Sequence, residues 1–443
     1  MMGDELNLDL EVGAEEVQDL APEATVPCEF TCGIAGSGKT FLWRERIAAD
    51  PTAGLLMATT GISAVNLGTV TVNSSLKFFD TDSLRDAYLT GQLVRRLKDI
   101  REDYRRIVID EVSMMDGQQL SIIVRAVLEC NSFKSPTGAP PLGIALVGDF
   151  CQLPVIKGQW AFDSDEWWRF ADNTTHLTKV WRQGAGPFLD ALNLARCGDG
   201  AGSSDLLSGQ GLEWHTSLDI GFTGTCIVTK NDAVDRYNGM ALDRLSTASF
   251  TLTNRRWGKQ RGEWKNIPER LTLKRGAYVM LLSNKYSEER ELLYANGDCG
   301  TVVAEGLTEL QVELVRNGEV VSVSRIVRDT GRKDKPEGWG RDGCTGAGEW
   351  VPQPHWMPSK KRFVDGQINY WPVRLAYAST VHKSQGVSLD RCQIDIRDSF
   401  FRQPAMLYVA LSRCRTLEGL RIVGQPERYI RNCNIDPKVR PWL

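Results

Sequence analysis

The chain has 443 residues, of which 42% are hydrophobic and 25% are charged, and a net charge of -3. This length predicts a globular protein of two or three domains, and the charge gives no global attraction to nucleic acid, although a local basic surface would be enough. Eleven cysteines without C-x-x-C pairs and four histidines argue against a disulfide framework and a zinc knuckle, and favour an intracellular location. With no run of 18 apolar residues and an acidic beginning, we expect neither a membrane span nor a signal peptide.

Residues 1–23 contain eight Asp and Glu and no Lys or Arg, which predicts a mostly disordered acidic lead-in. A strand at Cys28–Cys32 and a helix at Phe41–Ala49 flank the loop GIAGSGKT. This loop fits G-x-x-x-x-G-K-[ST], in which backbone N–H groups hold phosphate oxygens. A glycine turn that happens to contain Lys-Thr is the alternative, but the flanking elements favour a nucleoside triphosphate. The residues that would bind the phosphates are Gly33, Gly36, Ser37, Gly38, Lys39 and Thr40, with Thr40 also on Mg²⁺.

The second predicted strand, Gly54–Ala58, ends in Thr59 and Thr60. Small hydroxyl side chains at the carboxyl end of a parallel strand face the crevice where ligands bind. The alternative is that Thr60 caps a helix.

A third apolar strand, Arg106–Asp110, delivers two adjacent carboxylates, Asp110 and Glu111, to its end. Beside a phosphate loop, the first acid would hold the Mg²⁺ shell and the second would orient or deprotonate the attacking water. A fourth strand, Gly143–Asp149, leads to Gln152, which suits a sensor of the γ-phosphate. The alternation of strands and helices predicts a parallel sheet with helices on both faces.

A hinge is expected at Gly184–Pro187, followed by a second α/β unit with a strand at Cys226–Thr229 and a helix from Asn231, its expected N-cap. The α/β pattern resumes at Val373–Ala378 and continues to Val423.

Between these halves, residues 252–371 read as short strands with a small β-barrel. Arg255–Arg275 holds eight Lys and Arg, two acids, Trp257 and Trp264, a mixture suited to single-stranded nucleic acid. The alternative is a solvated surface over core tryptophans. Residues 328–353 are expected to form a loop.

Seven segments in order carry a family resemblance: GIAGSGKT, ATTGISAVNLGTVTVNSS, IDEVSM, GDFCQLP, LTKVWRQ, YASTVHKSQGVSLD and YVALSRCRT. With them the chain resembles superfamily 1 helicases of the B-type branch, which includes Dda, RecD and Pif-type enzymes. The resemblance implies an α/β fold of two RecA-like P-loop NTPase domains, with ATP and Mg²⁺ in the cleft between them. The implied boundaries are 24–183 for the first domain with a small insertion at about 77–100, 184–251 and 372–443 for the second, and 252–371 for the β-rich insertion.

The resemblance also implies roles for individual residues. Lys39 and Thr40 bind phosphate and Mg²⁺, Asp110 is a metal-shell ligand, Glu111 is the catalytic base and Gln152 senses the γ-phosphate. Arg182 and Arg413 resemble two arginines that the second domain contributes to the γ-phosphate. Trp181 would stack on adenine, and Gln385 and Gly386 would link the nucleotide state to the grip on DNA. The implied DNA contacts are Thr59, Thr60, Asn73, Ser379, Thr380, His382 and Ser384, with a structural His as the alternative for His382.

The sequence departs from the family at three places. Upstream of the phosphate loop, where the family has a Gln that reads adenine, this chain has only Gln18. Asn73 stands where relatives tend to have a His. The pin that separates the strands is unassigned, with Phe78 and Phe79 as candidates.

The implied activity is that of an ATP-dependent DNA helicase moving 5′ to 3′ on single-stranded DNA, with forked duplex as substrate and roles in DNA replication and repair. A nucleic-acid-stimulated ATPase or translocase without strand separation, and an RNA helicase, are the alternatives. We further expect a monomer in the cytoplasm of a bacterium or phage-infected host, with single-strand-binding or replication proteins as partners.

Overall fold

The computed structural model describes residues 26–155, 158–260, 264, 267–288, 292–294, 296–332, 351, 353–357 and 362–443. The acidic lead-in and Gln18 lie outside these residues, as does most of the loop expected at 328–353. The beginning of that predicted loop is a strand instead, because Ile326–Arg332 pairs with a long neighbouring strand. None of the helices in the described part of the chain has the length and apolar character needed to cross a bilayer.

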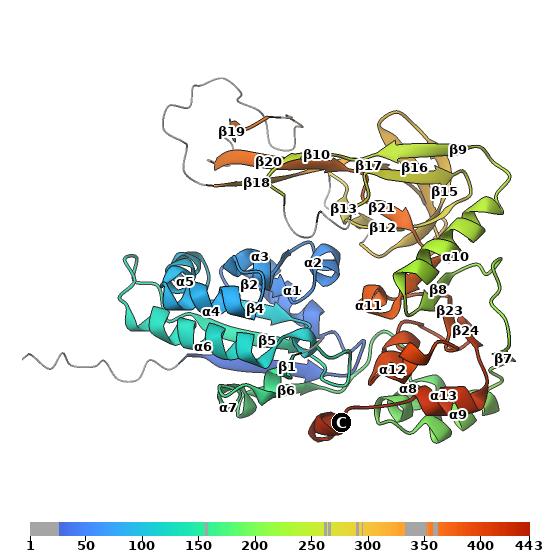
Figure 1. The fold of residues 1–443 in the computed structure, drawn as a ribbon, viewed down its shortest axis with the longest axis horizontal. Helices are drawn as coiled ribbons and strands as arrows, with labels where there is room; N and C mark the ends of the chain where they lie inside the picture. Colours follow the sequence, from blue (N-terminus) through green and yellow to red (C-terminus); the bar gives the residue numbers. More distant parts are fainter. Residues whose placement is uncertain are drawn as a thin grey trace, which may run out of the picture.

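The first α/β unit is built on a six-stranded sheet in the order β3-β2-β4-β5-β1-β6, in which every pair is parallel (Figure 1). Its strands are β1 Cys28–Gly33, β2 Leu55–Ala58, β3 Val70–Thr71, β4 Arg106–Asp110, β5 Gly143–Gly148 and β6 Thr174–Leu177. Its helices are α1 Lys39–Ala49, α2 Gly61–Leu67, α3 Val72–Leu76, α4 Thr81–Leu89, α5 Gln92–Asp103, α6 Gly117–Ser132 and α7 Trp168–Ala171. Parallel pairing brings the carboxyl ends of β1, β4 and β5 to one edge.

Strand β4 is apolar throughout because both faces of the sheet are covered. Val108 packs with Trp43 of α1, whereas Ile107 and Ile109 belong to the large core cluster that includes Leu120 of α6. This burial on two sides fixes the strand whose end carries the two adjacent carboxylates.

The second α/β unit has a five-stranded parallel sheet in the order β22-β8-β23-β24-β7. Its strands are β7 Trp214–His215, β8 Thr225–Val228, β22 Ala378–Thr380, β23 Cys392–Asp395 and β24 Leu420–Val423. Its helices are α8 Pro187–Arg196, α9 Gly200–Gly209, α10 Asn231–Asp243, α11 Val381–Ser384, α12 Met406–Leu411 and α13 Pro426–Asn432. Lys230 and not Asn231 occupies the N-cap position of α10, where no side chain caps the helix, since Asn231 already lies in the first turn.

The β-rich region between β8 and β22 is antiparallel and stands above both α/β units in Figure 1. One sheet has the order β17-β16-β15-β12-β21, and a second has the order β10-β20-β18 with β19 on β20. The strands are β9 Ser249–Thr253, β10 Arg255–Gly258, β11 Arg270–Lys274, β12 Tyr278–Leu281, β13 Lys285–Tyr286, β14 Leu292–Tyr294, β15 Cys299–Glu305, β16 Glu309–Leu314, β17 Val320–Ser324, β18 Ile326–Arg332, β19 His355–Met357, β20 Arg362–Tyr370 and β21 Val373–Leu375. Trp264 lies in a core with Ile368 and Tyr370, so this tryptophan is structural.

After α13 the chain returns to the first unit, where its last helical turn, Pro437–Trp442, packs (Figure 1). We call this segment the return strap. The Trp442 ring lies among Phe30, Phe150, Phe162 and Trp167, with centroid distances between 4.9 and 5.7 Å. Trp160 Nε1 also donates to Asp436 Oδ2 at 2.9 Å, and Lys438 Nζ lies 2.7 Å from Asp163 Oδ2. The return strap therefore joins the two α/β units a second time.

Trp442→Ala is expected to lower the free energy of unfolding by about 2 kcal/mol, less than the roughly 3–5 kcal/mol of a fully buried aromatic because Trp442 is only partly buried. Chemical denaturation followed by circular dichroism measures this change. Trp168→Ala is the control, since Trp168 is 61% exposed and should cost less than about 1 kcal/mol. An equal loss in both variants would contradict the anchoring role of the return strap.

Candidate nucleotide-binding cleft

The phosphate loop connects β1 to α1 in a conformation that requires glycine. Gly36 and Gly38 both have φ near +84°, a region that side chains of L-residues rarely adopt. A Cβ on Gly36 would also lie 2.6 Å from Cβ of Arg182. Helix α1 begins at Lys39 with Gly38 as its N-cap, and no side chain caps it. Its first N–H groups can thus hold a phosphate group.

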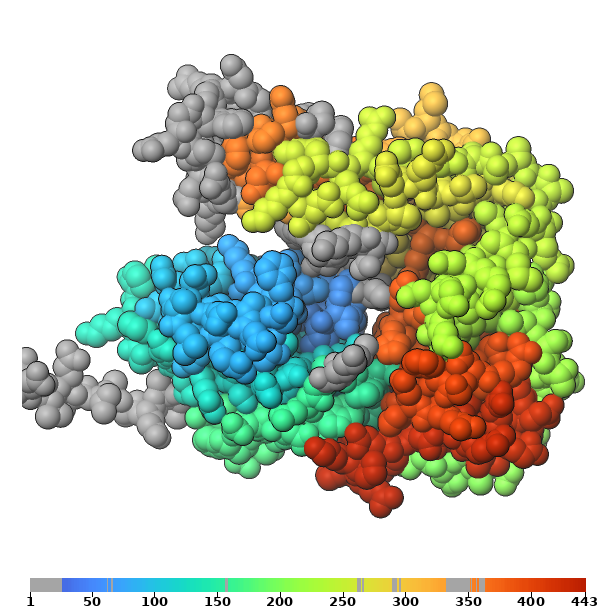
Figure 2. All heavy atoms as spheres, viewed as in Figure 1, coloured from blue at the N-terminus to red at the C-terminus, as the bar shows by residue number. Residues whose placement is uncertain are grey.

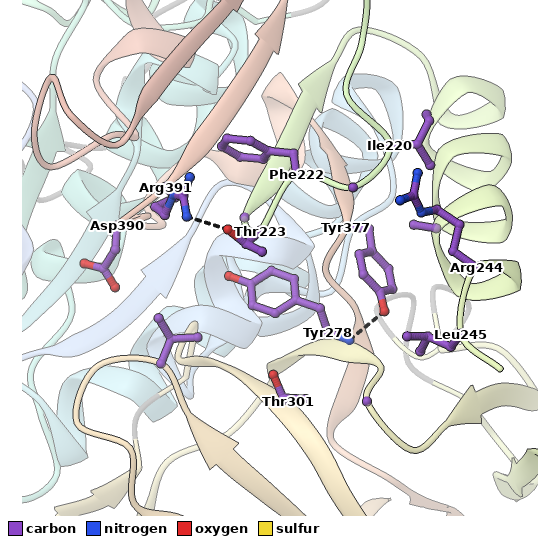
Figure 3. Close-up of a pocket in the computed structure, with 15 residues that line it drawn as sticks. Ile220, Phe222, Thr223, Arg244, Leu245, Tyr278, Thr301, Tyr377, Asp390 and Arg391 are labelled. Carbon is purple, nitrogen blue, oxygen red and sulfur yellow. Dashed lines mark hydrogen bonds between the residues drawn. The ribbon is translucent and has the colours of Figure 1, made fainter. Parts of the chain in front are cut away.

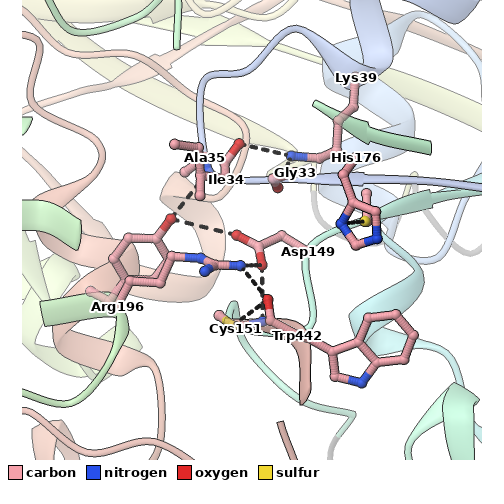
Figure 4. Close-up of polar contacts among 11 residues, drawn as sticks. Gly33, Ile34, Ala35, Lys39, Asp149, Cys151, His176, Arg196 and Trp442 are labelled. Carbon is pink, nitrogen blue, oxygen red and sulfur yellow. Dashed lines mark hydrogen bonds and ion pairs between the residues drawn. The ribbon is translucent and has the colours of Figure 1, made fainter. Parts of the chain in front are cut away.

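The Lys39 side chain folds back over this loop and is 8% exposed. Its ammonium donates to the carbonyl oxygens of Gly33 at 2.8 Å and Ile34 at 3.1 Å (Figure 4). Burial lowers the pKa of Lys39, and the carboxylates of Asp149, Glu111 and Asp110 oppose that effect. Ser37, in the same loop, has a buried hydroxyl without a partner. A cation over the loop and an unsatisfied hydroxyl inside it fit a triphosphate.

Thr40 and Asp110 meet at the end of β4, where Thr40 Oγ1 donates to Asp110 Oδ2 at 2.9 Å. Asp110 is 3% exposed, and burial followed by the charge of Glu111 raises its pKa to about 7. A hydroxyl and a carboxylate oxygen are hard ligands, and Mg²⁺ usually takes one or two carboxylates plus phosphate oxygens and waters. Among the described residues no group of three or more His, Cys, Asp or Glu could hold a metal alone. The pair therefore fits a cation that the phosphates help to bind.

Glu111 has a left-handed backbone, with φ +57°, which is uncommon for a residue with a side chain. Thr59 Oγ1 donates to its carbonyl oxygen at 2.9 Å, and Asp110 Oδ1 accepts from its N–H at 2.9 Å. The Glu111 carboxylate accepts a 2.9 Å hydrogen bond from Gln385 Nε2, which also lies 3.4 Å from Gln152 Oε1. Three predicted site residues, from the first unit and the second, are thus in contact.

Arg413 follows α12 and is 1% exposed. Its guanidinium donates to the Val409 carbonyl at 2.8 Å and the Ser412 hydroxyl at 2.6 Å. Burial, and next the charge of Arg182, lower the pKa of Arg413, whereas Glu111 raises it. Arg413 Nη1 also donates to Ser384 O at 3.4 Å and Val387 O at 3.5 Å, so the guanidinium is held by its own segment and by the segment around α11.

Arg182 lies on residues 178–186, which connect β6 to α8 and which we call the connector, and not on the second unit as predicted. The connector packs against the phosphate loop at Gly36. Trp181 N donates to Gly36 O at 2.8 Å, and Arg182 Nη1 donates to Ser412 O at 3.1 Å. The Trp181 ring is 69% exposed, with Lys179 Nζ 3.6 Å from its centroid. An exposed indole beside the loop leaves one ring face for a base.

Several residues predicted to contact DNA bond to their own backbone. Thr60 and Thr380 accept N–H bonds from Ser63 and Lys383, as helix N-caps do. Ser379 and Ser384 are 5% and 2% exposed.

The remaining predicted DNA contacts are less enclosed. Asn73 Nδ2 donates to Phe79 O at 3.3 Å, and burial lowers the pKa of His382. Phe78 is 3% exposed and Phe79 is 93% exposed, so only Phe79 is free to touch a ligand. Gly386, predicted to act with Gln385, has φ +77° in the turn after α11.

A hollow of about 490 Å³ lies elsewhere, between the second unit and the β-rich region (Figure 3). Phe222, Arg244, Tyr278 and Tyr377 are among its lining residues. None of the phosphate-loop residues lines this hollow. The nucleotide site is therefore assigned from the geometry of the motif residues and not from this hollow.

Sequence reasoning missed Gln183, Asp149, Arg196 and Tyr408. Gln183 Nε2 donates to Ser412 O at 3.1 Å and to Cys414 O at 2.8 Å, which ties the connector to the second unit. The sequence did contain one indication of their importance, because Gln183 lies in the motif LTKVWRQ and Asp149 in the motif GDFCQLP.

A phosphate loop and an acidic pair lie at the end of one parallel sheet, and Gln385 of a second α/β unit bonds to Glu111 of that pair. This arrangement defines a P-loop ATPase with two RecA-like units. The comparisons are more specific: the PIF1-like helicase family matches residues 12–190. This match covers less than half of the chain, and it shows that the first α/β unit resembles PIF1-like helicases.

The chain is 29% identical to ATP-dependent DNA helicase Pif1 of Bdellovibrio bacteriovorus over 422 residues, which cover 93% of this chain and 86% of that protein. It is 30% identical to human ATP-dependent DNA helicase PIF1, over 93% of this chain and 60% of the human protein. A crystal structure of a Pif1 helicase from Bacteroides is 26% identical with a TM-score of 0.65, covering 91% of this chain and 89% of that one. The structure of Pif1 from Candida albicans has the same fold at 21% identity, with a TM-score of 0.65 and 95% of each chain covered.

Proposed function

We propose that the protein is an ATP-dependent DNA helicase that moves 5′ to 3′ along single-stranded DNA and unwinds forked duplexes. The observation that carries this proposal is the Glu111, Gln152 and Gln385 cluster, in which residues of both units meet beside the phosphate loop. The relatives named above are ATP-dependent DNA helicases, which supports DNA as the polymer.

ATP with Mg²⁺ would supply a phosphoanhydride whose hydrolysis drives the motion. The loop N–H groups and Lys39 would hold the phosphates, and Thr40 and Asp110 would hold the ion. Glu111 would orient the attacking water and take a proton from it, while Gln152 would sense the γ-phosphate. Arg413 and Arg182 would offset negative charge on the phosphate. Trp181 would stack on adenine, and Gln385 with Gly386 would couple the nucleotide bound in the cleft to the grip on DNA.

The DNA strand is proposed to run over the tops of the two units and below the β-rich region. Figure 2 shows the β-rich region (yellow to orange) above the first unit (blue). Arg255 and Arg256 of β10 are exposed, and Trp257 beside them is partly exposed. Cations suit the phosphates of a single strand and an aromatic ring suits its bases. The proposed contacts from the motor units are Thr59, Thr60, Asn73, Ser379, Thr380, His382 and Ser384.

We also propose the domain boundaries given above, with the β-rich region extended to Ser249 and Leu375 because β9 and β21 pair with its strands. A monomer is proposed as the working unit, with single-strand-binding or replication proteins as partners in a bacterial or phage-infected cytoplasm. Sedimentation velocity with and without single-stranded DNA tests the monomer.

The deciding experiment is strand displacement on forked duplexes that carry either a 5′ or a 3′ single-stranded tail, with ATP and Mg²⁺. We expect unwinding only from the 5′ tail. Unwinding only from the 3′ tail would reverse the polarity. DNA-stimulated hydrolysis without displacement would favour a translocase, and displacement only of RNA duplexes would favour an RNA helicase.

A further inference from the structure

We infer that Tyr408 is a positioning residue that ties the phosphate loop to helix α12 and thereby sets where Arg413 stands relative to the nucleotide. This inference rests on the proposed ATPase function. The sequence analysis gave Tyr408 no role, although it lies in the same motif as Arg413.

The contact that carries the inference crosses the cleft. Tyr408 is 4% exposed, and its hydroxyl oxygen accepts a 3.1 Å hydrogen bond from the N–H of Ala35, the third residue of the phosphate loop. The hydroxyl also lies 3.5 Å from Asp149 Oδ2, to which it can donate. Burial raises the pKa of Tyr408, so the hydroxyl keeps its proton at neutral pH. One side chain of the second unit thus bonds to the loop and to the end of β5.

Asp149 is a fixed anchor for this hydroxyl. It is 2% exposed and accepts from Arg196 Nη2 at 3.1 Å and from Cys151 N at 3.0 Å (Figure 4). Arg196 Nη2 also donates to the Trp442 carbonyl at 2.8 Å, within the return strap. A buried carboxylate with two donors and a paired guanidinium is costly to displace. Tyr408 is therefore hydrogen-bonded to a carboxylate that Arg196 and Cys151 hold in place.

A short rigid stretch connects Tyr408 to Arg413. Ser412 N donates to Tyr408 O at 2.9 Å, and Arg413 Nε donates to Val409 O at 2.8 Å. Ser412 O in turn accepts from Arg182 on the connector. The Tyr408 hydroxyl is thus one of the contacts that set the position of Arg413, and it is the one that links α12 directly to the phosphate loop; Arg413 Nη1 also donates to Ser384 O at 3.4 Å and Val387 O at 3.5 Å. Without that hydroxyl, the loop can still bind phosphate, but α12 loses its direct bond to the loop, and the distance between Arg413 and the phosphates is set less tightly.

The test is Tyr408→Phe, with Tyr429→Phe as the matched control. Tyr429 is fully buried and its hydroxyl lies 2.7 Å from Ser203 Oγ, inside the second unit and away from the cleft. Both variants keep the ring and lose a buried hydroxyl, Tyr408→Phe its bonds to Ala35 N and Asp149 Oδ2 and Tyr429→Phe its bond to Ser203, so both should fold. Their steady-state ATP hydrolysis is measured with saturating single-stranded DNA.

We expect Tyr408→Phe to lower kcat about tenfold while KM for ATP changes less than about threefold, because the loss concerns a group that acts in the transition state. Tyr429→Phe should leave both constants within about twofold of the unmodified protein. Equal kinetics in the two variants, or a rise in KM with unchanged kcat for Tyr408→Phe, would overturn the inference. If the unmodified protein itself does not hydrolyse ATP, the proposed function fails instead.

Discussion

Glu111→Gln is expected to abolish steady-state ATP hydrolysis while ATP binding is retained. The amide has the size of the carboxylate and can still accept from Gln385 Nε2, but it cannot take a proton from water. The loss should be about 10²–10⁴-fold in kcat, the range of a general base. Release of inorganic phosphate measures turnover, and titration with a fluorescent ATP analogue measures binding.

Glu45→Gln is the matched control for this substitution, since Glu45 is exposed on α1 of the same unit. It should leave both measurements unchanged. Hydrolysis by Glu111→Gln near the unmodified rate would show that another group is the base. Loss of binding in Glu111→Gln would mean that the residue holds the nucleotide or its ion instead.

Arg413→Ala is expected to remove DNA-stimulated hydrolysis with DNA binding largely intact. An arginine placed on the γ-phosphate contributes about 10³–10⁵-fold to kcat. Lysine at this position should recover only part of the rate, because an ammonium group lacks the planar fork of the guanidinium. Hydrolysis assays and fluorescence anisotropy on single-stranded DNA separate the two activities.

Arg413 is buried, so its removal can also cost stability, and Arg101→Ala controls for this effect. Arg101 is 8% exposed and donates to the carbonyl oxygens of Pro140, Ala139 and Phe133, within the first unit and away from the cleft. It should lower the free energy of unfolding while folded protein keeps its rate. A variant Arg413→Ala that loses only DNA binding would remove Arg413 from the phosphate.

The parts of the site that depend on neighbouring residues could be predicted from the sequence. Gly36 and Gly38 were readable because only glycine suits their backbone, and Asp110 and Glu111 because they end an apolar strand. The sheet class followed from the alternation of strands and helices. These signals are contained in a few neighbouring residues.

The features that the sequence did not predict depend on contacts between residues that lie far apart in the chain. The Ala35 to Tyr408 bond spans 373 residues, and no local pattern marks a buried tyrosine as a partner of the loop. Trp264 and Trp257 looked alike, yet one is core and the other partly exposed, since burial depends on which strands pair around them. Thr60 and Thr380 suit both a helix cap and a ligand, and the cap is the contact that the structure contains.

The return strap has a mechanical consequence. The chain crosses from the first unit to the second through the connector at Arg182 and crosses back before Trp442, so two separate covalent links span the cleft. The second attachment depends on the packing of Trp442 among Phe30, Phe150, Phe162 and Trp167. A wide separation of the two units therefore has to pull this ring out of its aromatic surroundings, which opposes such a separation.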